Sequence, residues 1–293
     1  MAEKTLAKLT HLHAPMTELD FSEEEIRRYS RHIVLPEVGG LGQKRINRAS
    51  VLVVGAGGLG SPVAYYLAAA GVGKIGIVDN DVVDLSNLQR QILHTTTDVG
   101  RKKVDSARET LLALNPQLTI VPHDVRLNST NILDILKEYD LVAEGSDNFP
   151  TKFLVNDACV MTGTPLSMAG IFRFSGQILT VLPGLGPCYR CLIPQPPPPG
   201  AIPSCQEAGV FGAMAGAVGV VQATEILKLI LGKGEVLNGR LLLFEALQMR
   251  FEPIEVKRNP DCPVCSESPS ITKLIDYDIA CEMAQPPAPR SSS

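Results

Sequence analysis

The chain has 293 residues, of which 45% are hydrophobic, and a net charge of −4 at pH 7. This length can bury one large core or two modest ones, and the weak negative charge gives no indication of a nucleic-acid or anionic-membrane surface. No stretch reaches the roughly 20 uninterrupted apolar residues of a membrane span, and residues 1–20 lack the apolar centre of a signal peptide. Seven cysteines, four of them in CxxC pairs, fit a reducing compartment with metal binding better than a disulfide framework. We therefore expect a cytoplasmic protein that binds neither nucleic acid nor membrane.

The N-terminal region is predicted to begin with a flexible arm over residues 1–20. Ser22-Glu-Glu-Glu25 then matches a capping box, in which the serine hydroxyl accepts from the glutamate amide and the glutamate carboxylate reaches back. A short helix over Glu23–Ser30 should follow.

Strand and helix patterns alternate from residue 51 to about residue 165. Short apolar runs predict parallel strands at Val51–Val54, Lys74–Asp79, Leu118–Pro122 and Leu141–Glu144. Helices are expected between them, from Gly60 to about Ala70, near Lys103–Leu114 and near Asn131–Glu138. This alternation predicts an α/β fold with a doubly wound, Rossmann-like, mostly parallel sheet.

The pattern changes after about residue 165. Gly176–Leu182, Arg240–Phe244 and Glu252–Lys257 are predicted strands of an antiparallel extension, and a long helix, Val210–Leu231, lies between them. Residues 285–293 are rich in proline and serine and should be disordered. The expected organisation is a single domain over residues 21–284, with a nucleotide-binding half at about 21–165 and a second half at about 166–284.

A glycine-rich turn follows the first predicted strand. Gly55, Gly57 and Gly60 match the GxGxxG pattern between a strand and a helix, a context that favours a nucleotide phosphate at the helix N-terminus. Asp79 ends the second strand, where an acid commonly accepts hydrogen bonds from ribose hydroxyls. The alternative is a glycine turn without a ligand, and the motif alone does not separate NAD from ATP.

Charged residues beyond the second strand favour a triphosphate. A triphosphate needs fixed cations, which Arg90 and Lys103 could supply. Asp147 follows the fourth strand, where a carboxylate is well placed to hold Mg²⁺. The alternatives are a solvated face for the two cations and a helix cap for Asp147, ahead of the Phe149–Met161 segment.

Two cysteine pairs lie far apart in the second half. Cys188, Cys191, Cys262 and Cys265 form two CxxC turns, and two such turns complete a tetrahedral Cys₄ zinc site. A closed site of this kind leaves no position for substrate, so we predict a structural zinc. The alternatives are two disulfides or free thiols.

Cys205 stands apart from these pairs. It follows the proline-rich segment Pro194–Pro203 and precedes a predicted helix, where a thiol can have a lowered pKa and act as a nucleophile. The alternative is an inert loop thiol.

These motifs, in this order, resemble the ubiquitin-activating-enzyme-like superfamily, and specifically the sulfur-carrier adenylyltransferases of the MoeB and ThiF type. The chain is also similar to the N-terminal part of longer relatives that carry a rhodanese domain. The resemblance covers about Phe21 to Cys281. It rests on the following segments: Arg28-Tyr-Ser-Arg31-His, Gly55-Ala-Gly-Gly-Leu-Gly60, Ser86-Asn-Leu-Gln-Arg90-Gln, Ser146-Asp147-Asn148, Cys188-Tyr-Arg-Cys191 and Cys262-Pro-Val-Cys265.

The resemblance implies a set of contacts to ATP or its Mg²⁺. The residues so implied are Gly58, Asp79, Ser86, Asn87, Arg90, Lys103, Asp147 and Asn148. It further implies that Arg31 reaches across a homodimer to the phosphates of the partner, whereas the sequence alone favours an ordinary surface arginine.

The activity implied is ATP-dependent adenylation of the C-terminal Gly-Gly carboxylate of a ubiquitin-like sulfur carrier, with Cys205 in later thioester or persulfide chemistry. The second half would bind the carrier. No rhodanese domain follows Cys281 in this sequence, so the sulfur donor, a rhodanese or a cysteine desulfurase, is expected to be a separate protein. An NAD-dependent oxidoreductase and a non-catalytic zinc scaffold remain rival readings. The pathway served, whether molybdopterin, thiamine or tRNA thiolation, is left open.

Overall fold

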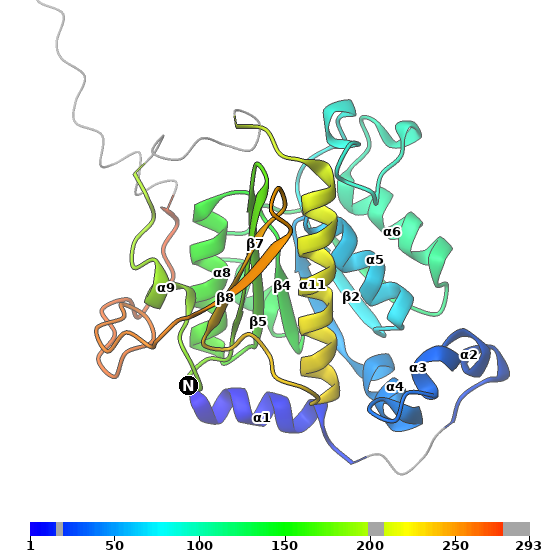
Figure 1. The fold of residues 1–293 in the computed structure, drawn as a ribbon, viewed down its shortest axis with the longest axis horizontal. Helices are drawn as coiled ribbons and strands as arrows, with labels where there is room; N and C mark the ends of the chain where they lie inside the picture. The colour runs from blue at the N-terminus through cyan, green and yellow to red at the C-terminus, as the bar shows by residue number, and fades with distance from the viewer. Residues whose placement is uncertain (16–19, 199–207, 278–293) are drawn as a thin grey trace, which may run out of the picture.

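The computed structural model describes residues 1–15, 20–198 and 208–277. Eight strands form one sheet in the order β3-β2-β1-β4-β5-β6-β7-β8 (Figure 1). The first five strands are parallel, and β6, β7 and β8 join antiparallel. The predicted doubly wound sheet with an antiparallel extension is thus confirmed. The strands are β1 (Ser50–Val54), β2 (Lys74–Val78), β3 (Thr119–His123), β4 (Leu141–Glu144), β5 (Leu166–Phe172), β6 (Ser175–Val181), β7 (Arg240–Glu245) and β8 (Arg250–Glu255).

Helices cover both faces of the sheet. One buried cluster joins β1 and β2 to α4, α5, α6 and α11, and a second joins the opposite face to α7, α8 and α9 (Figure 1). The described helices are α1 (Ala2–Leu12), α2 (Glu23–Arg28), α3 (Ser30–Ile33), α4 (Gly39–Arg48), α5 (Gly60–Ala70), α6 (Lys103–Leu114), α7 (Ile132–Leu136), α8 (Phe149–Thr162), α9 (Tyr189–Leu192) and α11 (Gly212–Leu231).

Helix α11 is long and apolar enough to cross a membrane by length and composition. It nevertheless buries polar side chains in bonds to the sheet. Gln222 Nε2 donates to the backbone oxygens of Glu144 and Ser167, and the Glu225 carboxylate accepts from Thr180 Oγ1 at 2.7 Å. Such hydrogen bonds to neighbouring strands are typical of a helix in the core of a protein.

The N-terminal arm was predicted to be flexible, and for α1 this prediction is wrong. Thr5 is fully buried, and its hydroxyl reaches Gly163 O at 3.1 Å and Pro183 O at 2.8 Å. Leu12 joins the core, and His13 Nε2 lies 2.9 Å from Leu229 O at the end of α11. The surface that orders α1 is built by distant segments, so no local pattern announces it.

Strand β5 was not predicted, yet it sets the change of direction in the sheet. It pairs parallel with β4 and antiparallel with β6. Its sequence, Leu-Ser-Met-Ala-Gly-Ile-Phe, holds a glycine and few β-branched residues, which weakens the local strand signal. The segments predicted as disordered, 285–293, and the thiol Cys205 lie outside the described residues.

Candidate active site and metal centre

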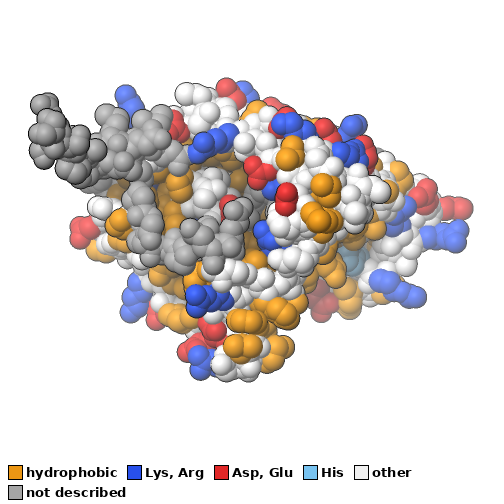
Figure 2. Space-filling view, turned by 90° about the horizontal axis from the view of Figure 1, so that it is seen from above, with side chains coloured by type: hydrophobic (Ala, Val, Ile, Leu, Met, Phe, Trp, Pro, Cys, Tyr) orange, Lys and Arg blue, Asp and Glu red, His pale blue; other side chains and the backbone are white. Residues whose placement is uncertain are grey.

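The glycine turn joins β1 to α5 at the carboxyl edge of the sheet. Gly55 has a φ of +93°, which favours glycine, and a Cβ on Gly60 would lie 1.7 Å from Gly55 O. The N-terminus of α5 receives no side-chain cap. The Ser61 and Val63 amides already donate to Gly57 O and Leu59 O, and Pro62 has no amide hydrogen, so the helix offers a phosphate mainly the partial positive charge of its N-terminus. Figure 2 looks onto this end of the molecule, where charged side chains border a hollowed region.

Asp79 holds the turn from the neighbouring strand. Its Oδ2 accepts from the Ala56 amide at 2.8 Å, and its Oδ1 accepts from the Asp81 amide at 2.9 Å. A carboxylate has about four lone-pair sites, so capacity remains for ribose hydroxyls.

Ser86 and Asn87 lie in the 3₁₀ turn η1 (Leu85–Asn87) that follows β2. The amide and hydroxyl of Ser86 both donate to Asp84 Oδ1, and these bonds lower the pKa of Asp84. Asn87 Oδ1 accepts from the Asp84 amide at 3.2 Å. The turn is thus braced before any ligand binds.

Arg90 lies beside the glycine turn, and Lys103 lies beside Asp81, just beyond β2. A Cβ on Gly58 would meet Arg90 Cγ at 3.4 Å, and Arg90 Nη1 donates to Ser86 O at 3.0 Å. The Lys103 side chain is only 7% exposed, and its Nζ lies 2.8 Å from Asp81 Oδ2. The alternative interpretation, in which Lys103 lies on a solvated face, is therefore wrong.

Asp147 follows β4, whose end lies against the glycine turn. The Gly145 amide donates to Val54 O at 3.0 Å. Asn148, and not Asp147, caps α8, because Asn148 Oδ1 accepts from the Thr151 amide at 2.9 Å. Among the described residues no hydrogen bond or ion pair engages the exposed Asp147 carboxylate, so its oxygens suit a hard cation.

His94 is a site residue that sequence reasoning missed. Its Nε2 lies 3.0 Å from Ala56 O in the glycine turn, and its Nδ1 lies 2.8 Å from Ser106 Oγ on α6. Burial lowers the pKa of His94, so the neutral imidazole is favoured. No motif or spacing marks this residue, because its partners come from distant segments.

Arg31 lies far from the glycine turn of its own chain. Its neighbour Tyr29 accepts from Asn115 Nδ2 at 2.9 Å, and Arg28 donates to Leu114 O, so α2 and α3 pack at the C-terminal end of α6 (Figure 1). Lys103 begins α6, and a helix of twelve residues spans about 18 Å. The exposed Arg31 side chain is too short to close that gap.

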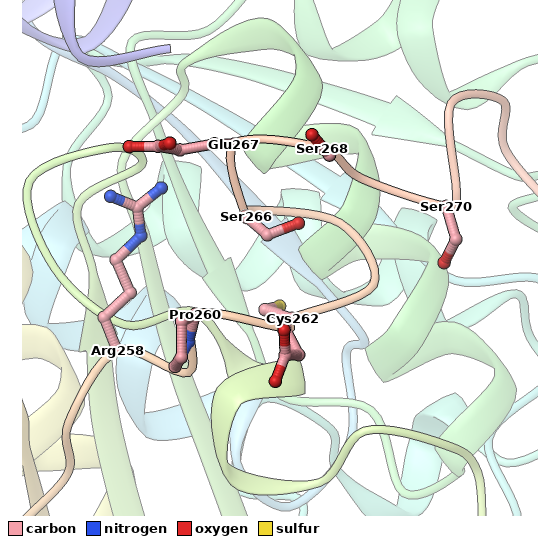
Figure 3. A pocket seen from close by; sticks show the side chains of 8 residues that line it. Arg258, Pro260, Cys262, Ser266, Glu267, Ser268 and Ser270 are labelled. Atoms are coloured by element: carbon pink, nitrogen blue, oxygen red, sulfur yellow. The ribbon is translucent and has the colours of Figure 1, made fainter.

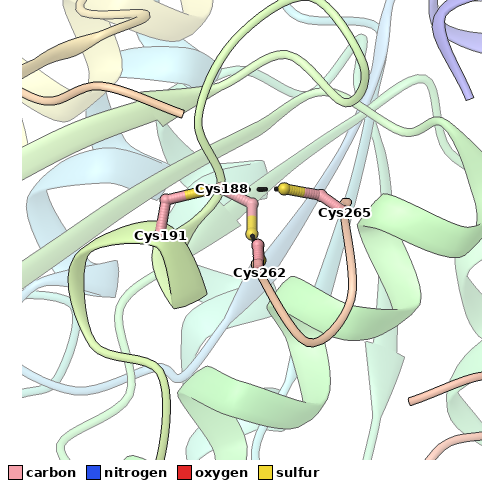
Figure 4. A group of neighbouring side chains, drawn as sticks. All are labelled: Cys188, Cys191, Cys262 and Cys265. Carbon is pink, nitrogen blue, oxygen red and sulfur yellow. Dashed lines mark hydrogen bonds between the residues drawn. The ribbon is translucent and has the colours of Figure 1, made fainter. Parts of the chain in front are cut away.

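The four predicted metal ligands meet at one point. Their sulfur atoms all lie within 4.8 Å of one another, and Figure 4 shows them converging from α9 and from the 262–265 turn. The closest sulfurs, Cys191–Cys265 and Cys188–Cys262, are 3.4 and 3.5 Å apart, far beyond the roughly 2.05 Å of a disulfide. A metal–sulfur bond of about 2.3 Å in a tetrahedron places sulfurs nearly 4 Å apart.

A buried ion pair fastens this metal centre to α8. Arg190, between the first two cysteines, is 1% exposed and binds Asp157 through Nε at 2.7 Å and Nη2 at 2.8 Å. Its Nη1 donates to Pro194 O, and Tyr277 contacts Nη2. The Tyr189 amide donates to Asn156 Oδ1. Hydrogen bonds therefore hold the cysteine turn in place independently of any metal.

A hollow of about 670 Å³ borders the cysteine cluster (Figure 3). Its lining comes from the segment between Arg258 and Ser270 and includes Ser266 and Glu267. None of the predicted nucleotide-binding residues lines it, so we do not assign it to ATP.

The fold and these groups define a nucleotide-binding α/β protein with a Cys₄ cluster arranged as a candidate metal site. The ThiF family profile matches residues 29–264, and the chain belongs to the ThiF family. It is 53% identical over 266 residues to the sulfur carrier protein adenylyltransferase of Thermus thermophilus, covering 89% of this chain and 98% of that protein. It is 50% identical over 264 residues to the probable adenylyltransferase/sulfurtransferase MoeZ of Mycobacterium tuberculosis, covering 89% of this chain but 66% of MoeZ. The crystal structure of E. coli MccB with MccA shares the fold, with a TM-score of 0.73, 24% identity, and coverage of 85% and 76% of the two chains.

Proposed function

We propose that this protein is an ATP-dependent adenylyltransferase that acts on the C-terminal Gly-Gly carboxylate of a ubiquitin-like sulfur carrier. The observations that support the proposal lie around the glycine turn: Arg90 packs against Gly58, and the end of β4, which leads into Asp147, bonds to the end of β1. Lys103 is held nearby by Asp81, whose amide donates to Asp79. The names of the relatives point to the same activity.

The reaction joins a carrier carboxylate oxygen to the α-phosphorus of ATP and breaks the bond to the bridging oxygen, releasing pyrophosphate. The attacking carboxylate is already ionised, so no general base is needed. Arg90 and Lys103 balance the negative charge that builds on the phosphates, and catalysis is mainly positioning and electrostatic stabilisation. Asp147 would hold Mg²⁺, which neutralises phosphate oxygens when bound.

ATP fits this site better than a nicotinamide dinucleotide. A dinucleotide site has no need of two cations and an unengaged carboxylate around the glycine turn. Asp81 holds the Lys103 ammonium in position through one hydrogen bond of 2.8 Å. The other donors of this ammonium can bind phosphate oxygens of ATP.

The active unit is proposed to be a homodimer. Arg31 is exposed and about one helix length from its own glycine turn, so it can act on phosphates only in a partner subunit. The exposed apolar side chains Val34, Leu35 and Leu41 on the same segment support a protein contact there.

The carrier is proposed to dock on the antiparallel half. β8 is the edge strand of the sheet, and all its residues are exposed. Phe251 is 48% exposed and stacks on Phe244 at 4.1 Å, and Leu247 and Met249 in the same hairpin are more than 70% exposed. Such a patch suits the apolar face of a small partner domain.

Zinc is proposed as a structural ion at the cysteine cluster, consistent with four thiolates and no open position. Cys205 is proposed to handle sulfur after adenylation, with a rhodanese or a cysteine desulfurase as donor. The described cysteines form no disulfide, which is consistent with a cytoplasmic location.

The test is carrier-dependent exchange of labelled pyrophosphate into ATP, run against a panel of Gly-Gly carriers. We expect exchange with one carrier and none with a carrier lacking the terminal Gly-Gly. Absence of exchange with every carrier, together with retained carrier binding, would favour a scaffold. Tight NAD binding without ATP binding would favour an oxidoreductase.

A further inference from the structure

A buried ion pair lies at the base of the Gly145–Asn148 turn and takes no part in the reaction as written above. Glu144 ends β4 with its side chain 0% exposed, and Lys152 lies in the first turn of α8 with 11% exposed. Lys152 Nζ is 2.5 Å from Glu144 Oε2 and 2.7 Å from Ala169 O on β5. The pair therefore ties α8 to two strands of the sheet.

The second oxygen of this pair holds the turn itself. Glu144 Oε1 accepts from the Ser146 amide at 2.8 Å and also from the Ser146 hydroxyl. The Glu144 backbone oxygen accepts from Gln222 on α11, and Asn148 caps α8. Both neighbours of Asp147 are thus engaged, while among the described residues its own carboxylate is not.

Stability alone does not account for this arrangement. A cation in the first turn of a helix is disfavoured by the helix dipole, and the first turn of α8 contains no acidic residue to offset it. Burying two charges carries a desolvation cost that apolar residues would avoid. Lys152 also borders a small cavity with the apolar side chains of Met168, Leu179 and Leu241. A local conflict of this kind is expected where function requires it.

We propose that the Glu144–Lys152 pair is a positioning element for the metal-binding carboxylate. It holds the Gly145–Asn148 turn in the shape that presents Asp147 to the Mg²⁺ of MgATP. This inference rests on the proposed function. The Mg²⁺-dependent part of nucleotide binding should therefore require the ion pair. Binding of the nucleotide by the glycine turn should not require it.

The test measures binding of α,β-methylene-ATP by calorimetry, once with Mg²⁺ and once in buffer without added Mg²⁺ or chelator, so that the cysteine cluster keeps its metal, in the absence of carrier. For Lys152→Met we expect the gain in affinity from Mg²⁺ to fall about tenfold or more, since a misplacement near 1 Å can cost up to about a hundredfold. Affinity without Mg²⁺ should stay near that of the wild type. Lys152→Arg should restore most of the gain, because a guanidinium can also bridge Glu144 and Ala169. Lys137→Met is the matched control, since Lys137 forms an ion pair of 2.9 Å with a 64% exposed side chain, and it should change neither affinity.

An equal loss of affinity with and without Mg²⁺ would overturn the proposal in favour of a role in folding only, and so would an unchanged gain from Mg²⁺. If Lys152→Met does not melt cooperatively, Ser146→Ala serves instead, because it removes one bond to Glu144 and leaves the ion pair. A smaller loss of the Mg²⁺ gain would support the proposal, and no loss would overturn it. A wild type whose affinity does not respond to Mg²⁺ would contradict the proposed function itself, before any variant is compared.

Discussion

The ion pair between Arg190 and Asp157 allows a quantitative prediction about burial. Asp157→Asn keeps the shape of the side chain and removes its charge, so it leaves no cavity. Arg190 would then retain only neutral acceptors, namely the amide oxygen of the new side chain, Pro194 O and the Tyr277 hydroxyl, with 1% of its side chain exposed to water. Its cationic charge would lie unpaired in the interior.

Breaking a buried pair by removing one partner costs about 3–5 kcal/mol. A chain of this size loses roughly 2 °C of Tm for each kcal/mol, so we expect Tm to fall by roughly 6–10 °C. The matched control is Asp134→Asn, because Asp134 pairs with Lys137 at 2.9 Å with side chains 80% and 64% exposed. That surface pair should contribute at most about 0.5 kcal/mol.

The assay is thermal and urea unfolding at one protein concentration, with metal content measured in parallel. The double variant Asp157→Asn/Arg190→Met should recover part of the loss, since it removes the unpaired charge. If Asp157→Asn lowers the free energy of unfolding no more than Asp134→Asn does, burial does not make the Arg190–Asp157 pair more important for stability than a surface pair, and the prediction is refuted.

Four further outcomes are expected. Mixing Arg31→Ala with Asp147→Ala subunits should restore pyrophosphate exchange, because one site of each heterodimer then has both groups; heterodimers without activity would refute the trans role. Cys262→Ser should release zinc and loosen the antiparallel half, which metal analysis and limited proteolysis would detect; full zinc retention would contradict the assignment. Burial lowers the pKa of His94 in the folded state, whereas the unfolded chain protonates near its usual value of about 6.5. Stability from neutral His94 is thus fully present above about pH 6.5 and declines as pH falls below it, and His94→Gln should flatten that slope in unfolding curves. Cys205→Ala should keep pyrophosphate exchange and slow thiocarboxylate formation, followed by the mass of the carrier; unimpaired thiocarboxylate formation would leave Cys205 an inert thiol.

Sequence reasoning placed most of the regular elements near their observed bounds. β4 and α6 match the predicted ranges, and the capping box at Ser22 and Glu25 is present. Such elements carry their signal locally, in apolar runs and caps. The helix predicted over Glu23–Ser30 is instead divided at Tyr29, whose side chain is drawn into the core against Gly71. That division follows from a tertiary contact.

The candidate site was partly predictable for the same reason. Gly55 and Gly60 are needed because the turn itself has no room for side chains, and each CxxC turn brings two thiols together by its own geometry. Asp147 was proposed by the rule that ligands lie at the carboxyl ends of parallel strands, and Lys103 because a triphosphate needs fixed cations. Each of these inferences uses only a short stretch of chain and its position in a repeating pattern.

The sequence by itself therefore determined the class of fold, the glycine turn between β1 and α5 and the two CxxC turns, because the backbone geometry that each requires is encoded within a few residues. Only the tertiary structure decided that α1 packs against the core, that Arg31 lies away from its own glycine turn, and that Lys152 pairs with Glu144 next to Asp147. These features depend on which distant segments become neighbours and on which charges lose their contact with water. The energies of burial and charge pairing arise only once the sheet and its helices have come together.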